Sequence, residues 1–294
     1  MQSLAAFAPL SDTQREQRAY LLLDVFTGTP LQGNALGVLT DARGLSGEDM
    51  QRIARELNLS ETIFFLAPLG EGDVRIRIFT PTSELPFAGH PVLGGAIVAG
   101  AALGQTELSV ETDSGLVPVT LDPGAGRVRS GWMSQPLPTW GVLAQAPALL
   151  TAIGAERSVL PVEVYENGPR HAIVVLGSEE QVAALRPDLR AIEELGDICV
   201  NCVAGAGERW KSRMFAPSLG VPEDPATGSA AGAIAVHLAR HGVIAFGQEI
   251  EIRQGGEIGR PSLLRALARG TPQLLDSVSV GGSAVIIGAG RLAL

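Results

Sequence analysis

Residues 84–104 read Glu84-Leu-Pro-Phe-Ala-Gly-His-Pro-Val-Leu-Gly-Gly-Ala-Ile-Val-Ala-Gly-Ala-Ala-Leu-Gly104. After Glu84 this stretch has no Asp, Glu, Lys or Arg, and it is rich in Gly and Ala. Pro91 suits the first turn of a helix, because a residue there has no helical partner for an N–H. We therefore predict a loop over 87–90 and a helix over 91–103. A helix of such small apolar residues must be enclosed by other structure.

The start of this predicted helix favours an anion. The first N–H groups of a helix lack helical partners, and the helix dipole presents its positive end there. Gly89 and His90 lie at this point of the chain. The stretch therefore predicts an anion site in the protein interior.

A second stretch has the same design. Residues 224–240 read Asp224-Pro-Ala-Thr-Gly-Ser-Ala-Ala-Gly-Ala-Ile-Ala-Val-His-Leu-Ala-Arg240 and predict a second central helix over 227–241. Gly228 and Ser229 stand at its start, as Gly89 and His90 do at the first. We infer that the chain consists of two related halves that face each other.

Composition limits the possible partners and the compartment. The 294 residues carry a net charge of −9 and are 46% hydrophobic, which is ample for two cores but argues against nucleic acid and anionic membrane surfaces. The N-terminal apolar run has no basic residues before it, so we expect no secretory signal. Residues 87–103 fall short of the ~20 residues of a membrane span. We expect a soluble, cytoplasmic protein.

The domain boundary is placed in the Pro-rich segment Gln135-Pro-Leu-Pro-Thr-Trp140. It divides the chain into an N-terminal half, 18–134, and a C-terminal half, 135–294, whose last strand is free to return to the first half. In each half, runs of β-formers surround one apolar helix. The expected fold class is α+β with two domains.

Glu61 is the first candidate for chemistry. It lies in Leu59-Ser-Glu-Thr-Ile-Phe-Phe-Leu66, a predicted strand, on the same face as Ile63 and Phe65. If that face is the inner one, desolvation raises the pKa of the carboxyl towards neutrality, which suits a proton shuttle. The alternative is a strand-end Glu that reaches solvent.

Several motifs together resemble one protein family. They are Asp24-Val-Phe-Thr, Gly33-Asn34, Met50-Gln-Arg-Ile-Ala-Arg-Glu-Leu-Asn-Leu-Ser-Glu-Thr, Arg77-Ile-Phe-Thr-Pro, Glu84-Leu-Pro-Phe-Ala-Gly-His-Pro, Arg213-Met-Phe-Ala-Pro, Asp224-Pro-Ala-Thr-Gly-Ser-Ala and Gly259-Arg-Pro-Ser. The chain resembles the PhzF-like (phenazine-biosynthesis-like) proteins, which share the diaminopimelate epimerase fold. The resemblance implies two pseudo-symmetric halves, each a β-barrel-like sheet around a central helix, with the active site between them. The sequence departs from the family at Ala35, where Pro is usual.

The resemblance also implies roles for individual residues. It implies an isomerase that moves a proton within a small, carboxylate-bearing, dihydroaromatic-like metabolite without metal or organic cofactor, and a homodimer. Glu61 is then the acid/base, and His90 and Asp224 hold polar groups of the substrate. Backbone N–H groups at the helix starts stabilise negative charge, at Gly89, Gly228 and Ser229.

Two other functions stay open. A two-base epimerase or racemase of this fold would use cysteines at the helix starts, which this chain lacks. A non-catalytic small-molecule or anion-binding protein would keep the cleft without the reaction. The pair Cys199 and Cys202 is expected to be structural, because four scattered His do not supply the second ligand pair of a zinc site.

The remaining polar candidates are expected to be structural. His237 and His241 fall in the last turns of the second predicted helix, where cations favour the dipole. Arg77 is expected to be a solvated or paired surface residue rather than a ligand of the substrate. His171 is a weaker candidate for the lining of the cleft.

Overall fold

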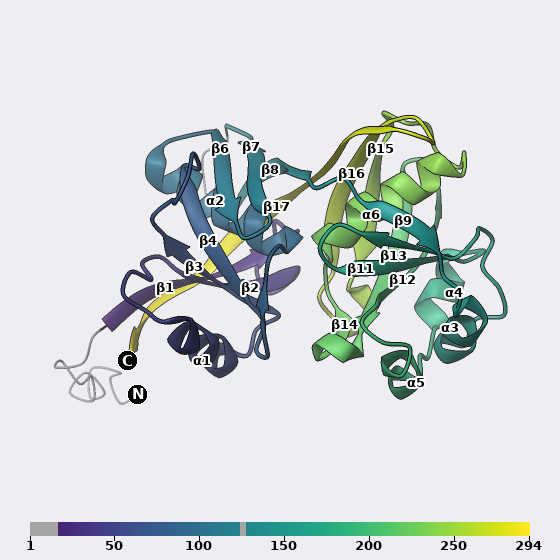
Figure 1. Ribbon diagram of the computed structural model, residues 1–294, viewed down its shortest axis with the longest axis horizontal. Coiled ribbons are helices and arrows are strands. Elements are labelled where there is room, and N and C mark those ends of the chain that lie inside the picture. The colour runs from purple at the N-terminus through teal and green to yellow at the C-terminus, as the bar shows by residue number, and fades with distance from the viewer. Residues whose placement is uncertain (1–16, 124–127) are drawn as a thin grey trace.

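The computed structural model describes residues 17–123 and 128–294 of the protein, so the expectations for the N-terminal extension lie outside the described residues. Figure 1 shows two lobes side by side, the first formed by the N-terminal half of the chain and the second by the C-terminal half. The helices are α1 (Gly47–Leu57), α2 (Gly89–Leu103), α3 (Ala146–Ile153), α4 (Glu179–Ala184), α5 (Leu189–Glu193) and α6 (Gly228–Arg240). The strands of the first lobe are β1 (Gln17–Val25), β2 (Asn34–Leu39), β3 (Glu61–Leu66), β4 (Val74–Phe79), β5 (Glu84–Leu85), β6 (Glu107–Thr112), β7 (Gly115–Leu121) and β8 (Val128–Gln135). The others are β9 (Thr139–Val142), β10 (Glu163–Glu166), β11 (Arg170–Val175), β12 (Cys199–Ala206), β13 (Arg209–Ala216), β14 (Val221–Asp224), β15 (Glu249–Gln254), β16 (Ser262–Gly270) and β17 (Leu275–Ala293).

The first lobe is a closed barrel of eight strands. Hydrogen-bonded pairs run from β1 to β2, β3, β4, β6, β7 and β8, then to β17, and β17 pairs with β1 to close the ring. Closure leaves no exposed strand edge among these eight. The C-terminal strand thus completes the barrel of the N-terminal half.

Helix α2 lies inside this barrel and contacts all eight of its strands. Its glycines make room for the inward side chains of the barrel. A Cβ at Gly94 would lie 2.5 Å from Leu36 Cδ2, and one at Gly100 would lie 2.3 Å from Leu121 Cδ1. The small residues of the sequence therefore let a helix fit where a barrel of this size has space only for side chains.

The second lobe repeats the arrangement with an open run of strands. The run passes from β9 through β10, β11, β12, β13, β15 and β16 to β17. Helix α6 packs against β11, β16 and β17, and its residues from Gly228 to Ala239 are all buried. Strand β17 belongs to both lobes: its first part pairs with β16 and its last part with β1 (Figure 1).

The expected α+β fold, with barrel-like sheets around central helices, is confirmed. Some sequence-based boundaries differ from the observed ones. Helix α2 begins at Gly89, two residues before the predicted start, so Pro91 is within its first turn. In the segment 135–140, which was expected to be a linker, β8 ends at Gln135 and β9 begins at Thr139, so residues 136–138 alone connect the two strands. Within the described residues, no helix has both the length and the apolarity needed to cross a membrane.

Candidate active site

The starts of α2 and α6 meet in the interior between the lobes. A Cβ built on Gly89 would lie 2.8 Å from the Cα of Gly228 and 2.8 Å from the backbone nitrogen of Ser229. Only glycine lets two backbones approach this closely. Two positive dipole ends therefore converge on one place, with first-turn N–H groups that have no helical partners.

A cavity of about 170 Å³ lies at this junction. Its polar lining includes Glu61, His90, Asp224, Ser229 and His171. Its apolar lining comes from both lobes and includes Leu85, Phe87, Met214, Leu219 and Val221. A larger hollow of about 680 Å³ lies elsewhere, over residues 154–159 and 176–186, but it contains none of these buried titratable groups. The cavity between the helix starts is therefore the candidate site.

Glu61 reaches the cavity from the first residue of β3. The inner face of this strand faces α2, because Ile63 and Phe65 are the side chains nearest to Gly95. The Glu61 side chain is 15% exposed, and its Oε2 lies 3.3 Å from His90 Nε2. Among the described residues, neither of these two buried atoms has a hydrogen-bond partner with good geometry, so the two side chains satisfy each other only by their 3.3 Å contact.

The protonation states of these residues follow from their burial. Desolvation raises the pKa of Glu61 well above the usual 4.5, and the negative charge of Asp224 raises it further. Desolvation lowers the pKa of His90 to about 3, although a hydrogen bond with the Ala35 backbone opposes this decrease. At neutral pH the imidazole is therefore uncharged, and the raised pKa of Glu61 shifts its carboxyl towards the protonated, proton-donating form.

Asp224 differs from Glu61 because it has hydrogen-bond donors. Its Oδ1 accepts from Asn34 Nδ2 at 2.9 Å, and its Oδ2 accepts from Thr227 Oγ1 at 2.6 Å. Desolvation raises the pKa of Asp224, and these two donors oppose the increase. Two buried carboxyls with different surroundings can divide acid and anion roles.

Ser229 occupies the corresponding place on α6. Its Oγ lies 3.0 Å from His171 Nε2, and its carbonyl oxygen accepts from Asn167 Nδ2 at 3.0 Å. His171 is fully buried, and desolvation lowers its pKa to about 3. Ser229 therefore presents its hydroxyl from a side chain and a backbone that are both held in place.

The structure brings together all six predicted site residues: Glu61, Gly89, His90, Asp224, Gly228 and Ser229 line one cavity. It also places His171 and Cys199 in the lining. Sequence analysis did not predict the contacts of Asn34, Thr227 and Asn201, although Asn34 stands in the quoted Gly33-Asn34 motif. Burial raises the pKa of Cys199 to about 12, so this thiol is neutral.

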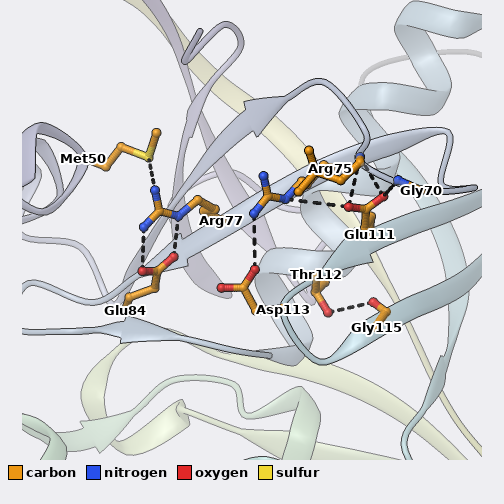
Figure 2. A network of polar contacts seen from close by, with 10 residues as sticks. Met50, Gly70, Arg75, Arg77, Glu84, Glu111, Thr112, Asp113 and Gly115 are labelled. Atoms are coloured by element: carbon orange, nitrogen blue, oxygen red, sulfur yellow. Dashed lines mark hydrogen bonds and ion pairs between the residues drawn. The ribbon is translucent and has the colours of Figure 1, made fainter. Parts of the chain in front are cut away.

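Arg77 lies outside the cavity, as expected for a paired residue. Its Nη2 donates to Glu84 Oε2 at 2.7 Å, and a neighbouring network joins Arg75 to Glu111 and Asp113 (Figure 2). These charges neutralise one another on the first lobe, away from the substrate cavity.

One further polar cluster has the residue types of a metal site. Ligand atoms of Glu163, His237 and His241 lie within 4.8 Å of one another. However, Glu163 Oε2 already accepts from Arg240 Nη1 at 2.7 Å and from Tyr165 OH at 2.7 Å. A carboxylate that is paired with a guanidinium is a poor ligand for a second cation. The cluster ties the end of α6 to β10.

Comparison with known proteins agrees with this geometry. The sequence profile of the phenazine biosynthesis-like protein family matches residues 23–290. A trans-2,3-dihydro-3-hydroxyanthranilate isomerase from Pseudomonas chlororaphis is 52% identical over 275 residues, which are 94% of this chain and 99% of that protein.

Two solved structures have the same fold. A predicted epimerase from Pseudomonas aeruginosa has a TM-score of 0.80 at 32% identity and covers 94% of this chain and 99% of its own. A PhzF-family phenazine biosynthesis protein from Bacillus anthracis has a TM-score of 0.81 at 24% identity and covers 95% of this chain and 100% of its own. The chain therefore belongs to the phenazine biosynthesis-like, or PhzF, family and is an isomerase.

Proposed function

We propose that the protein moves a proton between two carbons of a small dihydroaromatic carboxylate, with Glu61 as the only group that gives and takes that proton. The observation that carries the proposal is the state of Glu61: a buried carboxyl with a raised pKa that lines the cavity beside His90. A carboxyl whose pKa is raised towards the working pH is suited to start such a reaction as an acid.

The proposed reaction conserves all atoms. Glu61 donates its proton to one ring carbon, and a π-electron pair of the diene forms the new C–H bond. The resulting carboxylate then removes a proton from another ring carbon, and the electrons of that C–H bond restore the diene. Glu61 ends in its starting state, so the step needs no oxidant or second base.

The helix starts hold the substrate's negative charge. Backbone N–H groups of Gly89, Gly228 and Ser229 face the region where the two dipole ends converge, which suits a carboxylate. His90 and the Asp224 carboxylate lie beside Glu61 and suit a hydroxyl or amino group of the same ring. The cavity volume of about 170 Å³ matches a single-ring metabolite.

The compound named for the 52% identical relative is the first substrate to test. Wild-type protein incubated with trans-2,3-dihydro-3-hydroxyanthranilate in D2O should form the isomer, and this product should carry deuterium on a ring carbon. Glu61→Gln should bind the compound and lose exchange by about 10³-fold, because the amide cannot donate and retrieve the proton. Exchange at the wild-type rate in Glu61→Gln would contradict the proposal. Binding without exchange in the wild type would instead support the anion-binding alternative.

The wider organisation is proposed on the same basis. We propose that the halves 18–134 and 135–294 act as two lobes that each supply one helix start to the cavity, with β17 holding them together. The homodimer implied by the family resemblance and the cytoplasmic location expected from the sequence stay predictions, to be checked by light scattering and by cell fractionation.

A further inference from the structure

We propose that His171 and Asn201 are positioning residues that orient the Ser229 hydroxyl so that its hydrogen points to the substrate carboxylate. The inference rests on the proposed function, because it assigns the donor that recognises the carboxylate of that substrate. It concerns a chain of three side chains behind the cavity, Asn201–His171–Ser229, that the proposed proton shift does not use.

The chain of contacts is continuous and buried. Asn201 Nδ2 lies 3.4 Å from His171 Nδ1, and His171 Nε2 lies 3.0 Å from Ser229 Oγ. Asn201 and His171 are 0% exposed and Ser229 is 5% exposed, so water does not compete for these groups. Strands β11 and β12 are parallel neighbours in which His171 pairs with Cys199, so Asn201 lies two residues further along β12 and reaches His171 diagonally.

The orientation of the Asn201 amide follows from the backbone around it. Its Nδ2 lies 3.0 Å from the Cys199 carbonyl oxygen and 3.4 Å from the Ala172 carbonyl oxygen. Carbonyl oxygens only accept hydrogen bonds, so the group that faces them must be the amide nitrogen. The same nitrogen faces His171 Nδ1, and because an amide nitrogen does not accept hydrogen bonds, this contact favours an Nδ1 that carries no proton.

The protonation of His171 then follows. The buried imidazole is neutral and carries one proton. Because Nδ1 faces an N–H donor, this proton is on Nε2, which donates to Ser229 Oγ. Among the described residues, His171 is the hydrogen-bond partner of this hydroxyl oxygen. The Ser229 hydrogen is left to point into the cavity, where a carboxylate oxygen can accept it.

The reverse tautomer would have the opposite effect. If His171 carried its proton on Nδ1, Nε2 would accept from Ser229, and the serine would present lone pairs to the cavity. Lone pairs repel a carboxylate, whereas an O–H donor to a charged acceptor stabilises it. Asn201 therefore acts on the ligand through two intervening groups.

The tautomer can be tested directly. The protein has four histidines, so ¹⁵N-histidine NMR of the whole chain can resolve His171, with His171→Gln used to assign its signals. We expect the shifts of a neutral ring protonated at Nε2 throughout the neutral pH range. A neutral ring protonated at Nδ1 would overturn the inference, whatever the protein's reaction.

Binding tests the effect on the ligand without requiring catalysis. The probes are 3-hydroxyanthranilate, an aromatic counterpart that keeps the carboxylate, and 2-aminophenol, which lacks it. Ser229→Ala and His171→Leu should each lower the affinity for 3-hydroxyanthranilate by about tenfold and leave the affinity for 2-aminophenol unchanged. The double variant should be no weaker than Ser229→Ala, because His171 acts through the serine. His171→Gln should keep most of the affinity, since an amide N–H replaces Nε2–H.

Ser212 provides a control for these binding measurements. Ser212→Ala removes a hydroxyl that is fully buried in β13 and does not line the cavity, so it should leave both affinities unchanged. Additive losses, or equal losses for both probes, would show a structural role and overturn the inference. A wild type that fails to bind the carboxylate would overturn it together with the proposed function. A wild type that binds the probe but exchanges no deuterium would refute only the reaction.

Discussion

The starts of α2 and α6 share a backbone design and differ in the side chain that follows the first glycine. In α2, Gly89 is followed by His90, which lies against the acid Glu61. In α6, Gly228 is followed by Ser229, which lies against His171. The glycines allow the helix ends to meet and create one region for an anion. In the proposed function, the next residue determines whether the helix start lies beside the proton-transferring acid or binds the substrate carboxylate.

A second likeness between the halves is an Asn–His contact. Asn34 Nδ2 lies 3.3 Å from His90 Nδ1, and Asn201 Nδ2 lies 3.4 Å from His171 Nδ1. The two histidines occupy different elements, a helix start and a strand. The contact is therefore shared although the positions are not equivalent, so the repeat of the two halves does not account for it.

The largest expected effect separates the two halves by kinetics. Glu61→Gln should lower kcat by about 10³-fold, because the proton transfer itself is lost. Ser229→Ala should raise KM by about tenfold with a smaller change in kcat, because a ligand contact is lost. Steady-state kinetics with the substrate that the protein isomerises measure kcat and KM of both variants. If Ser229→Ala lowered kcat as much as Glu61→Gln does, the division of roles would be wrong.

Burial of Glu61 should also make the stability of the protein depend on pH. The pKa of Glu61 is raised by folding, so its stabilising contribution is full below pH 4.5 and is lost as the pH rises towards the folded-state value. Gln does not titrate. The unfolding free energy of Glu61→Gln minus that of the wild type should therefore increase by about 1.4 kcal/mol per pH unit above 4.5, until the folded-state pKa of Glu61 is reached. Urea denaturation at several pH values measures this, and a difference that is constant with pH would contradict it.

The close contact between the helix starts predicts a smaller effect, a loss of stability that differs between Gly89→Ala and Gly228→Ala. Gly89→Ala places a methyl group 2.8 Å from backbone atoms and should cost about 1–3 kcal/mol of stability. Gly228→Ala meets the Phe26 ring at 3.0 Å and Gly89 Cα at 3.1 Å, and should cost less. Gly141→Ala is the control, because no atom lies within 4 Å of its added Cβ. Thermal denaturation of the three variants should give this order, and equal losses would show that the junction is not tight.

The smallest expected effect concerns the acid limb of the pH profile. Desolvation raises the pKa of Asp224, and the hydrogen bond from Thr227 holds it down. Thr227→Val should therefore move the acid limb of kcat/KM to higher pH by about one unit, because the anion loses a donor. Thr112→Val is the control, since Thr112 bonds the Gly115 carbonyl oxygen on the first lobe (Figure 2). An unmoved limb would show that another group controls it.

The sequence predicted the parts of the site that lie in continuous motifs. Glu61, Gly89, His90, Asp224, Gly228 and Ser229 all stand in stretches whose composition or family resemblance marks them. The supporting residues were harder to predict, because their partners are distant in the chain. Asn34 is 190 residues from Asp224, and His171 is 58 residues from Ser229. No local pattern encodes such contacts.

The composition of residues 84–104 and 224–240 by itself determined that two helices of small residues must be enclosed and must present polar groups at their starts. Apolar surface has to be buried and first-turn N–H groups have to be satisfied, whatever the surrounding fold. Only the tertiary structure decided that β17 closes the first barrel and that the two helix starts meet at Gly89 and Gly228. Strand order and helix contact depend on which distant segments pack together, and that choice is made by the free energy of the whole molecule rather than by any one segment.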